Sequence, residues 1–298
     1  MKSWLIVISC IGLFYSCSTE GVKKKRSDDI VIQKNNNEIK GNKPNKSGKI
    51  SALNSDELAV KSTTSYDNGI TISWMKRGKG DLIKKGDVID IDYKVTLQDG
   101  KVIDGNHLKK MEFFSFVVGF QMQTKGWDYA LEKLKVGDFV RVKIPAELAR
   151  GEQGIKMEGE KGWFVPPNSV NYLTIRILRK LEPTRVVNGT KVWLIQENKD
   201  NKLKYNESNA ITFHSLVSSE STPLYYNSYR NNTPYTMLGT DKGIIPGLKK
   251  ALINAKKADR MFIVVPSEEA YGSKGLEGSV KPNEDLFYSV LVMDVVPK

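Results

Sequence analysis

Apolar and polar residues alternate along two stretches of the chain, one near residue 70 and one near residue 90. The first holds Ile70, Ile72 and Trp74, each separated by a polar residue. The second has the same spacing from Ile89 to Leu97. Because successive side chains of a strand point to opposite faces, this pattern predicts two half-buried β-strands. The turn pair Asp99-Gly100 then predicts a hairpin that leads into Val102-Ile103-Asp104.

Between residues 126 and 134 the spacing of apolar residues changes to that of a helix. Trp127, Ala130, Leu131 and Leu134 fall on one side of it, and Gly137-Asp138 ends it. Strands are predicted to follow over residues 139–144 and 172–178. Strands, one short helix and further strands indicate the α+β class, with a twisted antiparallel sheet wrapped on one short helix.

The whole order then returns at a constant offset of 121 positions, as from Gly126 to Gly247. The second copy predicts strands over 190–196, 211–217, 261–265 and 287–295 and a helix over 248–255. A repeat of this length indicates a duplicated domain of about 110 residues rather than a solenoid. The residues that agree without a gap are Gly126/Gly247, Ala130/Ala251, Leu131/Leu252, Lys135/Lys256, Asp138/Asp259, Pro145/Pro266, Glu147/Glu268, Ala149/Ala270 and Gly151/Gly272.

We therefore expect four parts. Residues 1–17 would be a signal peptide, 18–68 a flexible tether, 69–183 the first domain and 184–298 the second. Lys2 followed by a short apolar run from Trp4 to Tyr15 is typical of a secretory signal, and the run is too short for a membrane span. Ser16-Cys17-Ser18 resembles a bacterial lipobox, which predicts lipidation of Cys17. Cys10 as the lipidated residue, or a signal without a lipid, are the alternatives.

Residues 18–68 show no hydrophobic period and are rich in Lys, Asn and Gly, which predicts a segment that cannot bury enough apolar surface to fold. The chain carries a net charge of +12. For an exported chain this charge points to anionic lipid headgroups or polysaccharide, or to a solvated surface with no partner, rather than to nucleic acid. We expect a lipid-anchored protein of the cell envelope, at the outer membrane on its periplasmic or surface face.

Several kinds of chemistry lack the residues they need. The two cysteines of the chain lie in the leader, so the domains can form neither a disulfide nor a cysteine metal site. The two histidines, His107 and His214, occupy non-equivalent positions of the two copies and support no catalytic triad. We expect Asp90 and Asp92 to be solvated on the polar face of their strand rather than to bind a metal. No cofactor and no metal is predicted.

The shared motifs resemble those of the FKBP-type peptidyl-prolyl isomerases. They are the Gly126-Trp127 pair that opens the helix, the Gly137-Asp138 turn, the Pro-x-x-x-Ala-x-Gly segment from Pro145 to Gly151, and the Pro166-Pro167 loop before the last strand. The resemblance covers Gly69 to Leu181 and again Gly189 to Val296. It implies an apolar pocket that binds an Xaa-Pro segment, and a macrolide ligand of the family is a further expected partner.

Carried over to the first copy, the resemblance places Trp127 as the floor under the proline ring, Asp104 as a hydrogen-bonding group near the amide, and the Thr124 backbone N–H on the substrate carbonyl. Arg150 stands where the family has a tyrosine that grips the substrate, and Gln123 and Thr124 are more polar than the usual pair. The remaining pocket residues that the resemblance implies are Tyr93, Ile103, Phe114, Phe116, Val165 and Leu173.

In the second copy, Tyr271 restores the gripping hydroxyl and Leu248 replaces the tryptophan floor. The resemblance puts His214 at the place of the strand tyrosine and Tyr225 at that of the aspartate. His214 is expected to be a packed strand residue rather than an acid or base. Further residues implied at the second pocket are Tyr235, Ile244, Ile245, Val280 and Tyr288.

Two functions follow from these expectations. The first is a peptidyl-prolyl cis-trans isomerase that acts on exported proteins by stabilising the twisted amide without a covalent intermediate. The alternative is a weakly catalytic or non-catalytic envelope chaperone that holds Pro-containing segments. A purely structural envelope protein, with the aromatic residues serving only as core, is a third reading.

Overall fold

The computed structural model describes residues 59–157 and 162–297. The predicted signal peptide, Cys17, Cys10 and residues 18–58 of the predicted tether lie outside these residues. The described chain forms two seven-stranded sheets, one per sequence repeat, and a two-stranded ribbon. The change from the first sheet to the second falls between Leu181 and Arg185.

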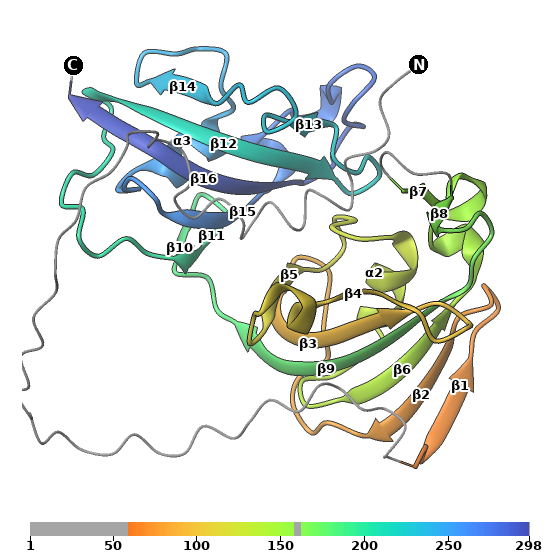
Figure 1. Ribbon diagram of the computed structural model, residues 1–298. Helices are drawn as coiled ribbons and strands as arrows, with labels where there is room; N and C mark the ends of the chain where they lie inside the picture. Colours follow the sequence, from red (N-terminus) through yellow and green to blue (C-terminus); the bar gives the residue numbers. More distant parts are fainter. Residues whose placement is uncertain (1–58, 158–161, 298) are drawn as a thin grey trace, which may run out of the picture. The chain divides into compact units, whose positions relative to one another are not determined.

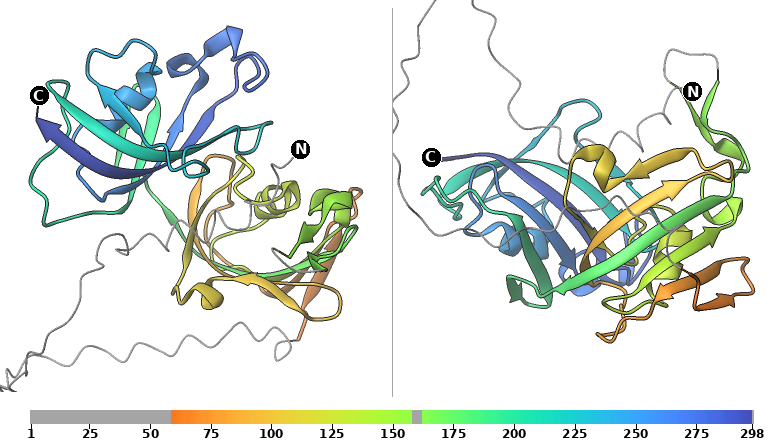
Figure 2. Two further views of the ribbon diagram at one scale, coloured as in Figure 1. Left: turned by 45° about the horizontal axis from the view of Figure 1, so that its top comes forward. Right: turned by 60° about the horizontal axis from the view of Figure 1, so that its bottom comes forward.

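The first sheet has the strand order β1-β2-β6-β9-β3-β4, and β5 pairs with β3 beside β4. All of its pairs are antiparallel. The sheet curves around the single short helix α2 (Lys125–Leu131), as Figures 1 and 2 show. The strands are β1 (Ser62–Ser65), β2 (Thr71–Lys76), β3 (Val88–Thr96), β4 (Val102–Gly105), β5 (Phe114–Val117), β6 (Phe139–Ile144) and β9 (Asn171–Leu181).

The second sheet repeats this topology as β10-β11-β15-β16-β12-β13, with β14 paired to β12 and the helix α3 (Pro246–Leu252) in the place of α2. The α+β class and the sheet-on-helix arrangement are therefore confirmed. The strands are β10 (Arg185–Val187), β11 (Thr190–Gln196), β12 (Asn209–Ser219), β13 (Tyr226–Asn227), β14 (Tyr235–Leu238), β15 (Arg260–Val265) and β16 (Leu286–Pro297).

Short elements close the loops at one end of each sheet. Corresponding pairs of 3-10 helices follow Pro145 and Pro266. The first repeat adds a ribbon that the second lacks. These elements are η2 (Asn106–Lys109), η3 (Ala146–Leu148), η4 (Gly151–Gln153), β7 (Ile155–Lys156), β8 (Trp163–Val165), η5 (Ser267–Glu269) and η6 (Gly272–Lys274).

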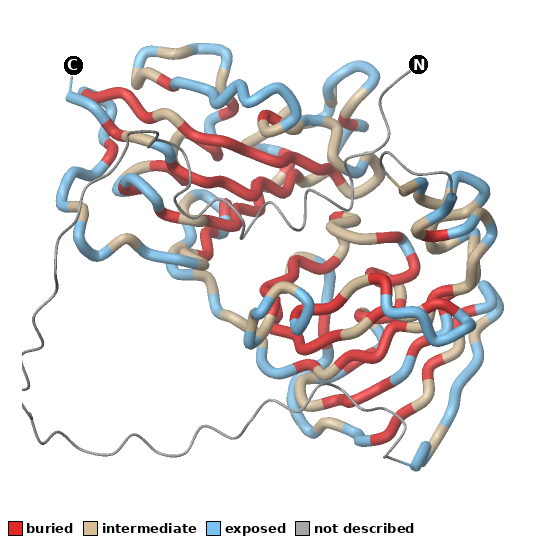
Figure 3. Tube along the Cα trace, viewed as in Figure 1, coloured by how far each residue is buried: buried red, intermediate tan, exposed pale blue. Residues whose placement is uncertain are grey.

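The core of each repeat lies between the concave face of the sheet and the helix, and the central strands are buried along most of their length (Figure 3). Gly126 permits this packing in the first repeat. A Cβ at Gly126 would lie 2.4 Å from Ile144 Cγ2 and 2.9 Å from the Leu148 carbonyl oxygen. Gly247 has the same role beside Val265 Cγ1. Because neither glycine has a Cβ, the first turn of each helix packs directly against the sheet.

Two sequence expectations differ from the structure. The sheet begins with β1, inside the segment 18–68 that we expected to be a tether. Its residues Ser62 to Ser65 are all polar, so no alternation marks them. They pair with β2 through the backbone and through two hydroxyl contacts, Thr63 with Ser73 and Ser65 with Thr71. As an exposed edge strand it needs no apolar face.

The second difference concerns Asp90 and Asp92, which are 1% and 8% exposed rather than solvated. Asp90 accepts hydrogen bonds from Ser115 Oγ at 2.7 Å and from Arg179 Nε at 2.6 Å. Burial raises the pKa of Asp92. The strands β5 and β9 pair with the two edges of β3 and place Ser115 and Arg179 beside the Asp90 carboxylate.

Candidate functional site

An aromatic box fills the first repeat beneath its sheet. Trp127, in the first turn of α2, is 3% exposed. Its ring stacks on Phe116, with centroids 5.7 Å apart, and meets the edge of Tyr93 at 5.2 Å. Phe114 closes the box against Tyr93 at 5.8 Å. Strands β3 and β5 supply three of these rings and the helix supplies the fourth, so the box depends on the sheet-to-helix packing described above.

A polar cluster adjoins this box at Tyr93. The Tyr93 hydroxyl donates to Asp104 Oδ2 at 3.1 Å, and Lys109 Nζ contacts Asp104 Oδ1 at 2.8 Å and the Tyr93 oxygen at 3.1 Å. Burial, followed by the Asp104 carboxylate, raises the pKa of Tyr93 far above its usual value. Tyr93 therefore remains a protonated donor at any physiological pH.

Lys109 is a site residue that the sequence did not single out. It ends η2, and its side chain is 18% exposed in the ion pair with Asp104. The Asp104 carboxylate is also held by its own neighbour, the Gly105 amide, at 2.8 Å. Lys109 and Lys110 are neighbours in the sequence, and the sequence alone does not predict which of them contacts Asp104. The 3-10 helix η2 directs the Lys109 side chain to Asp104.

Three polar groups lie on the helix side of the first site. The Arg150 guanidinium donates to Gln123 Oε1 at 3.5 Å, a weak contact. Burial lowers the pKa of Arg150, and the nearby Asp104 partly offsets that effect. Thr124, the residue before α2, is 9% exposed, and its hydroxyl has no hydrogen-bond partner among the described residues.

The other residues implied for the first pocket are buried. Ile103 is 9% exposed, and Val165 and Leu173 are fully buried. Leu173 lies in the central strand β9 and pairs with Val95 and Val142. The structure thus brings Tyr93, Asp104, Phe114, Phe116 and Trp127 into direct contact and keeps the aliphatic residues in the surrounding core.

The strand register of the second repeat corrects the sequence assignment of His214. In the first repeat Val140 pairs with Ile175, and Ile175 pairs with Tyr93. In the second repeat Met261, which corresponds to Val140, pairs with Val290, and Val290 pairs with Ser215. Ser215, not His214, therefore stands at the place of Tyr93.

The backbone register alone would put Tyr226 at the place of Asp104, because Asp104 pairs with Val95 and Tyr226 pairs with Val217. The Tyr226 side chain is 41% exposed, however, whereas Tyr225 packs against the core of the second site and forms a hydrogen bond with Tyr288. Tyr225 is therefore the tyrosine inside the second site, as the resemblance implied. The error at His214 is of one residue, which in a strand exchanges the inward face for the outward face.

His214 lies where Asp92 lies in the first repeat. Its Nδ1 is 2.9 Å from Ser228 Oγ, and its ring stacks on Tyr229 with centroids 4.4 Å apart. Burial lowers the pKa of His214. These contacts describe a packed strand residue, in agreement with the expectation from the sequence.

The second site is filled by phenols rather than by an indole. Leu248 is 3% exposed at the position of Trp127, and Tyr288 and Val280 join the same core. Tyr225 and Tyr271 pack against this core, as do the partly buried Ile244 and the buried Ile245. Burial raises the pKa of Tyr225 and that of Tyr288, and their hydroxyl groups form a hydrogen bond. Tyr235 is 36% exposed and packs on Phe213.

Comparison with known proteins decides what this pair of sites belongs to. The model of the family described as FKBP-type peptidyl-prolyl cis-trans isomerase matches residues 80–178 and 202–293, together more than half of the chain. The chain belongs to this family. Each match covers most of one sheet and its helix, so the chain carries two FKBP domains in tandem.

The relatives of this FKBP chain include eukaryotic proteins. The mouse peptidyl-prolyl cis-trans isomerase FKBP10 is 25% identical over 214 residues, which are 72% of this chain and 35% of the relative. FK506-binding protein 4 of Neurospora crassa is 37% identical over 117 residues, 39% of this chain and 23% of the relative. The chain therefore spans about a third or less of the length of these relatives.

Solved structures with similarity include the three FKBP domains of wheat FKBP73, at 22% identity over 78% of this chain and 97% of that one, with a TM-score of 0.38. FkpA from Escherichia coli is 29% identical over 40% of this chain and 52% of its own, with a TM-score of 0.34. Scores this low add nothing to the family assignment, which rests on the family model.

The two FKBP domains differ in the groups they present. The first has the tyrosine, aspartate and tryptophan that the family resemblance implied, at Tyr93, Asp104 and Trp127, but has Arg150 at the position of the gripping tyrosine. The second has that tyrosine, Tyr271, and lacks the other three groups. Neither domain carries the whole set.

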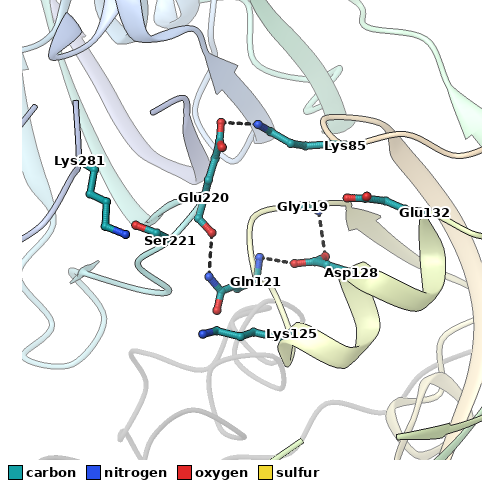
Figure 4. A pocket seen from close by; sticks show the side chains of 9 residues that line it. All are labelled: Lys85, Gly119, Gln121, Lys125, Asp128, Glu132, Glu220, Ser221 and Lys281. Carbon is teal, nitrogen blue, oxygen red and sulfur yellow. Dashed lines mark hydrogen bonds and ion pairs between the residues drawn. The ribbon is translucent and has the colours of Figure 1, made fainter. Parts of the chain in front are cut away.

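A polar hollow of about 430 Å³ lies away from the aromatic box (Figure 4). Its lining includes Asp128, which accepts hydrogen bonds from the backbone N–H groups of Gly119 and Gln121 at 2.9 and 2.8 Å. Gln121 Nε2 donates to the Glu220 carbonyl oxygen at 2.8 Å, and Lys85 forms an ion pair with the Glu220 carboxylate. Apart from Gly119, every residue that lines the hollow is polar or charged, which does not favour the binding of a proline ring.

Two further observations concern metals and membranes. Within residues 59–157 and 162–297, no group of three or more His, Asp, Glu or Cys side chains is placed to hold a metal ion. None of the helices in the described part of the chain is long and apolar enough to cross a membrane.

Proposed function

We propose that this chain is a peptidyl-prolyl cis-trans isomerase whose catalytic site is the first FKBP domain. The observation that carries the proposal is the aromatic box of Tyr93, Phe114, Phe116 and Trp127 with the Asp104 cluster against it. The family assignment gives the reaction, and the Trp127 indole supplies a flat apolar ring for the proline.

The reaction suits a site without a nucleophile. Rotation about a peptide bond has a barrier of about 18–20 kcal/mol, because the planar amide is stabilised by resonance. Uncatalysed Xaa-Pro isomerisation takes tens to hundreds of seconds. The planar amide is more polar than the twisted one. Transfer from water to an apolar box therefore disfavours the planar state, and contacts made only by the twisted amide lower the barrier.

Each named group has one task in this mechanism. The Trp127 indole supports the proline ring, and the Thr124 backbone N–H holds the substrate carbonyl in place. Asp104, fixed by Tyr93 and Lys109, accepts a hydrogen bond close to the rotating amide. No proton is transferred and no bond is broken.

We propose that the second domain binds Pro-containing segments and contributes little turnover. In the second domain Ser215, Tyr225 and Leu248 stand where the first domain has Tyr93, Asp104 and Trp127, the groups that act on the amide and the proline ring. Tyr271 and Ile245 still provide a hydroxyl and an apolar wall. This is the alternative chaperone function, restricted to one of the two domains.

The test is the exchange rate of the tetrapeptide Ala-Leu-Pro-Phe, followed by NMR with the full chain and with Trp127→Leu, the residue found at this place in the second domain. The change removes about 1–2 kcal/mol of apolar contact, which is roughly tenfold in kcat/KM. Tyr129→Leu is the matched control. It removes a ring from the same helix that packs on Tyr66 and not on Tyr93.

We expect the chain to accelerate exchange, Trp127→Leu to lose about tenfold and Tyr129→Leu to stay within twofold. No acceleration by a chain whose circular dichroism shows it to be folded would refute the isomerase proposal. Equal losses in the two variants would place the reaction elsewhere.

We also propose that the protein works outside the cytoplasm on exported clients, held to a membrane by a lipid on Cys17. The support is the leader sequence of residues 1–17. The mass of the mature N-terminal peptide tests this directly. A lipid-modified cysteine at position 17 is expected, and an intact leader would refute the proposal.

A further inference from the structure

At three equivalent positions of their sites, the first domain has polar or charged residues where the second has two isoleucines and a tyrosine. Gln123, Thr124 and Arg150 of the first domain correspond, at the constant offset of 121 positions, to Ile244, Ile245 and Tyr271 of the second. The backbone is the same in both: Arg150 has φ −104° and ψ −6°, and Tyr271 has φ −102° and ψ −2°. The side chains therefore leave the backbone alike, and the difference between the sites lies in their chemistry.

The Arg150 guanidinium has little to bind. Among the described residues its hydrogen-bond acceptor is Gln123 Oε1, 3.5 Å away, and no carboxylate lies within 4.0 Å of it. Asp104 is the nearby anion, yet its two oxygens already accept from Lys109, Tyr93 and the Gly105 amide. A partly buried cation without a close anion is unfavourable unless a ligand completes its hydrogen bonds.

A second donor beside it is also unused. Thr124 is 9% exposed, and its Oγ1 has no partner among the described residues. At this position the second domain has Ile245, whose side chain has no hydrogen-bonding group. A buried hydroxyl without a partner costs about 1–3 kcal/mol, so a bound acceptor group would recover this free energy. Arg150 precedes η4 and Thr124 precedes α2, and the contact of Arg150 with Gln123, the neighbour of Thr124, brings the two segments together.

We propose that Arg150 and Thr124 form a carboxylate subsite, which makes the first domain selective for substrates with an acidic residue immediately before the proline. The inference rests on the proposed function of this domain. With the proline on Trp127 and the amide carbonyl on the Thr124 N–H, the side chain of the preceding residue is the substrate group nearest to Arg150. A planar guanidinium binds a carboxylate through two parallel hydrogen bonds, for which a single phenol, as in Tyr271, has no equivalent.

The experiment compares the peptides Ala-Glu-Pro-Phe and Ala-Gln-Pro-Phe, which differ in charge and hardly in shape. Binding to the full chain at pH 7 is followed by the indole ¹⁵N–H signal of Trp127, which reports on the first site alone. We expect the Glu peptide to bind about tenfold more tightly, as a charge-assisted hydrogen bond predicts. In Arg150→Gln the ratio of the two dissociation constants should fall to about one.

Arg141→Gln is the matched control. It removes one positive charge from the same domain, at an exposed residue of β6 whose side chain lies over the Tyr172 ring. The tenfold ratio should persist in this variant. Loss of the ratio in Arg141→Gln as well as in Arg150→Gln would mean that overall charge, and not the subsite, selects the peptide.

A ratio near one in the unaltered chain, or a ratio that survives Arg150→Gln, overturns the subsite. If neither peptide shifts the Trp127 signal and neither is isomerised, the proposed function of this domain fails as well. If both peptides bind equally and are isomerised, the isomerase stands and only the acidic preference is lost. The two failures are therefore distinguishable.

Discussion

Asp128 makes the stability of the first FKBP domain depend on pH in a way that can be calculated. It lies on α2, is 8% exposed, and accepts hydrogen bonds from two backbone amides of the loop that leads to Thr124 (Figure 4). Burial raises the pKa of Asp128 from 3.8 to about 6, and the bonds from Gly119 and Gln121 only partly oppose it. The protonated form is thus favoured in the folded chain relative to the unfolded chain.

The sign and the size follow from linkage. Because the pKa is raised on folding, the stability that Asp128 contributes is present below about pH 3.8 and is lost as the pH rises through about 6. One pH unit of displacement corresponds to about 1.36 kcal/mol. Asp128→Asn cannot ionise. The free energy of unfolding of the unaltered domain, minus that of the variant, should therefore fall by about 2–3 kcal/mol between pH 4 and pH 7.5.

The assay is urea unfolding at a series of pH values, followed by the indole ¹⁵N–H signals. Trp74 and Trp127 report on the first domain, and Trp193 reports on the second and serves as an internal control. A difference between the two proteins that stays constant from pH 4 to pH 7.5 would refute the reasoning. A change that appears equally at Trp193 would show that some other group is responsible.

Two further predictions concern the packing and the polar cluster. Gly126→Ala should destabilise the first domain by about 1–3 kcal/mol in urea unfolding, because its Cβ would lie 2.4 Å from Ile144 Cγ2, whereas Gly243→Ala, with nothing within 4 Å, should stay within about 0.5 kcal/mol. Equal effects of the two changes would contradict the packing argument. Tyr93→Phe removes the hydroxyl between Asp104 and Lys109 and should cost about 1 kcal/mol of stability. A double-mutant cycle with Lys109→Met should give a coupling above about 0.5 kcal/mol, and a value near zero would show that the three groups act independently.

The sequence predicted the plan of each domain because its signals are local. The alternation near Ile70 and Ile89 marked β2 and β3, and the helical spacing around Trp127 marked α2, although the helix ends at Leu131 rather than at Leu134. The ungapped repeat then carried the same elements to the second half. Glycines such as Gly126 and Gly247 could be recognised by their positions, since only a residue without a Cβ fits there.

The errors fall where a partner strand decides the outcome. β1 is entirely polar and is a strand only because β2 offers its edge. His214 was placed one residue away from the correct equivalent, Ser215. The offset that aligns the helices does not hold in β12, and inward and outward faces alternate with every residue. Asp90 was expected in water because its partners, Ser115 and Arg179, are distant in sequence.

For this protein, then, the sequence by itself determined the two-domain α+β plan, the helix, and the residue types available at each site, because periodicity and motif spacing are properties of neighbouring residues. Only the tertiary structure decided that Lys109 and not Lys110 holds Asp104, that Ser215 faces the second site, and that Arg150 forms no ion pair with any described residue. Strand register and the pairing of buried charges depend on contacts between distant segments, and nothing local specifies them.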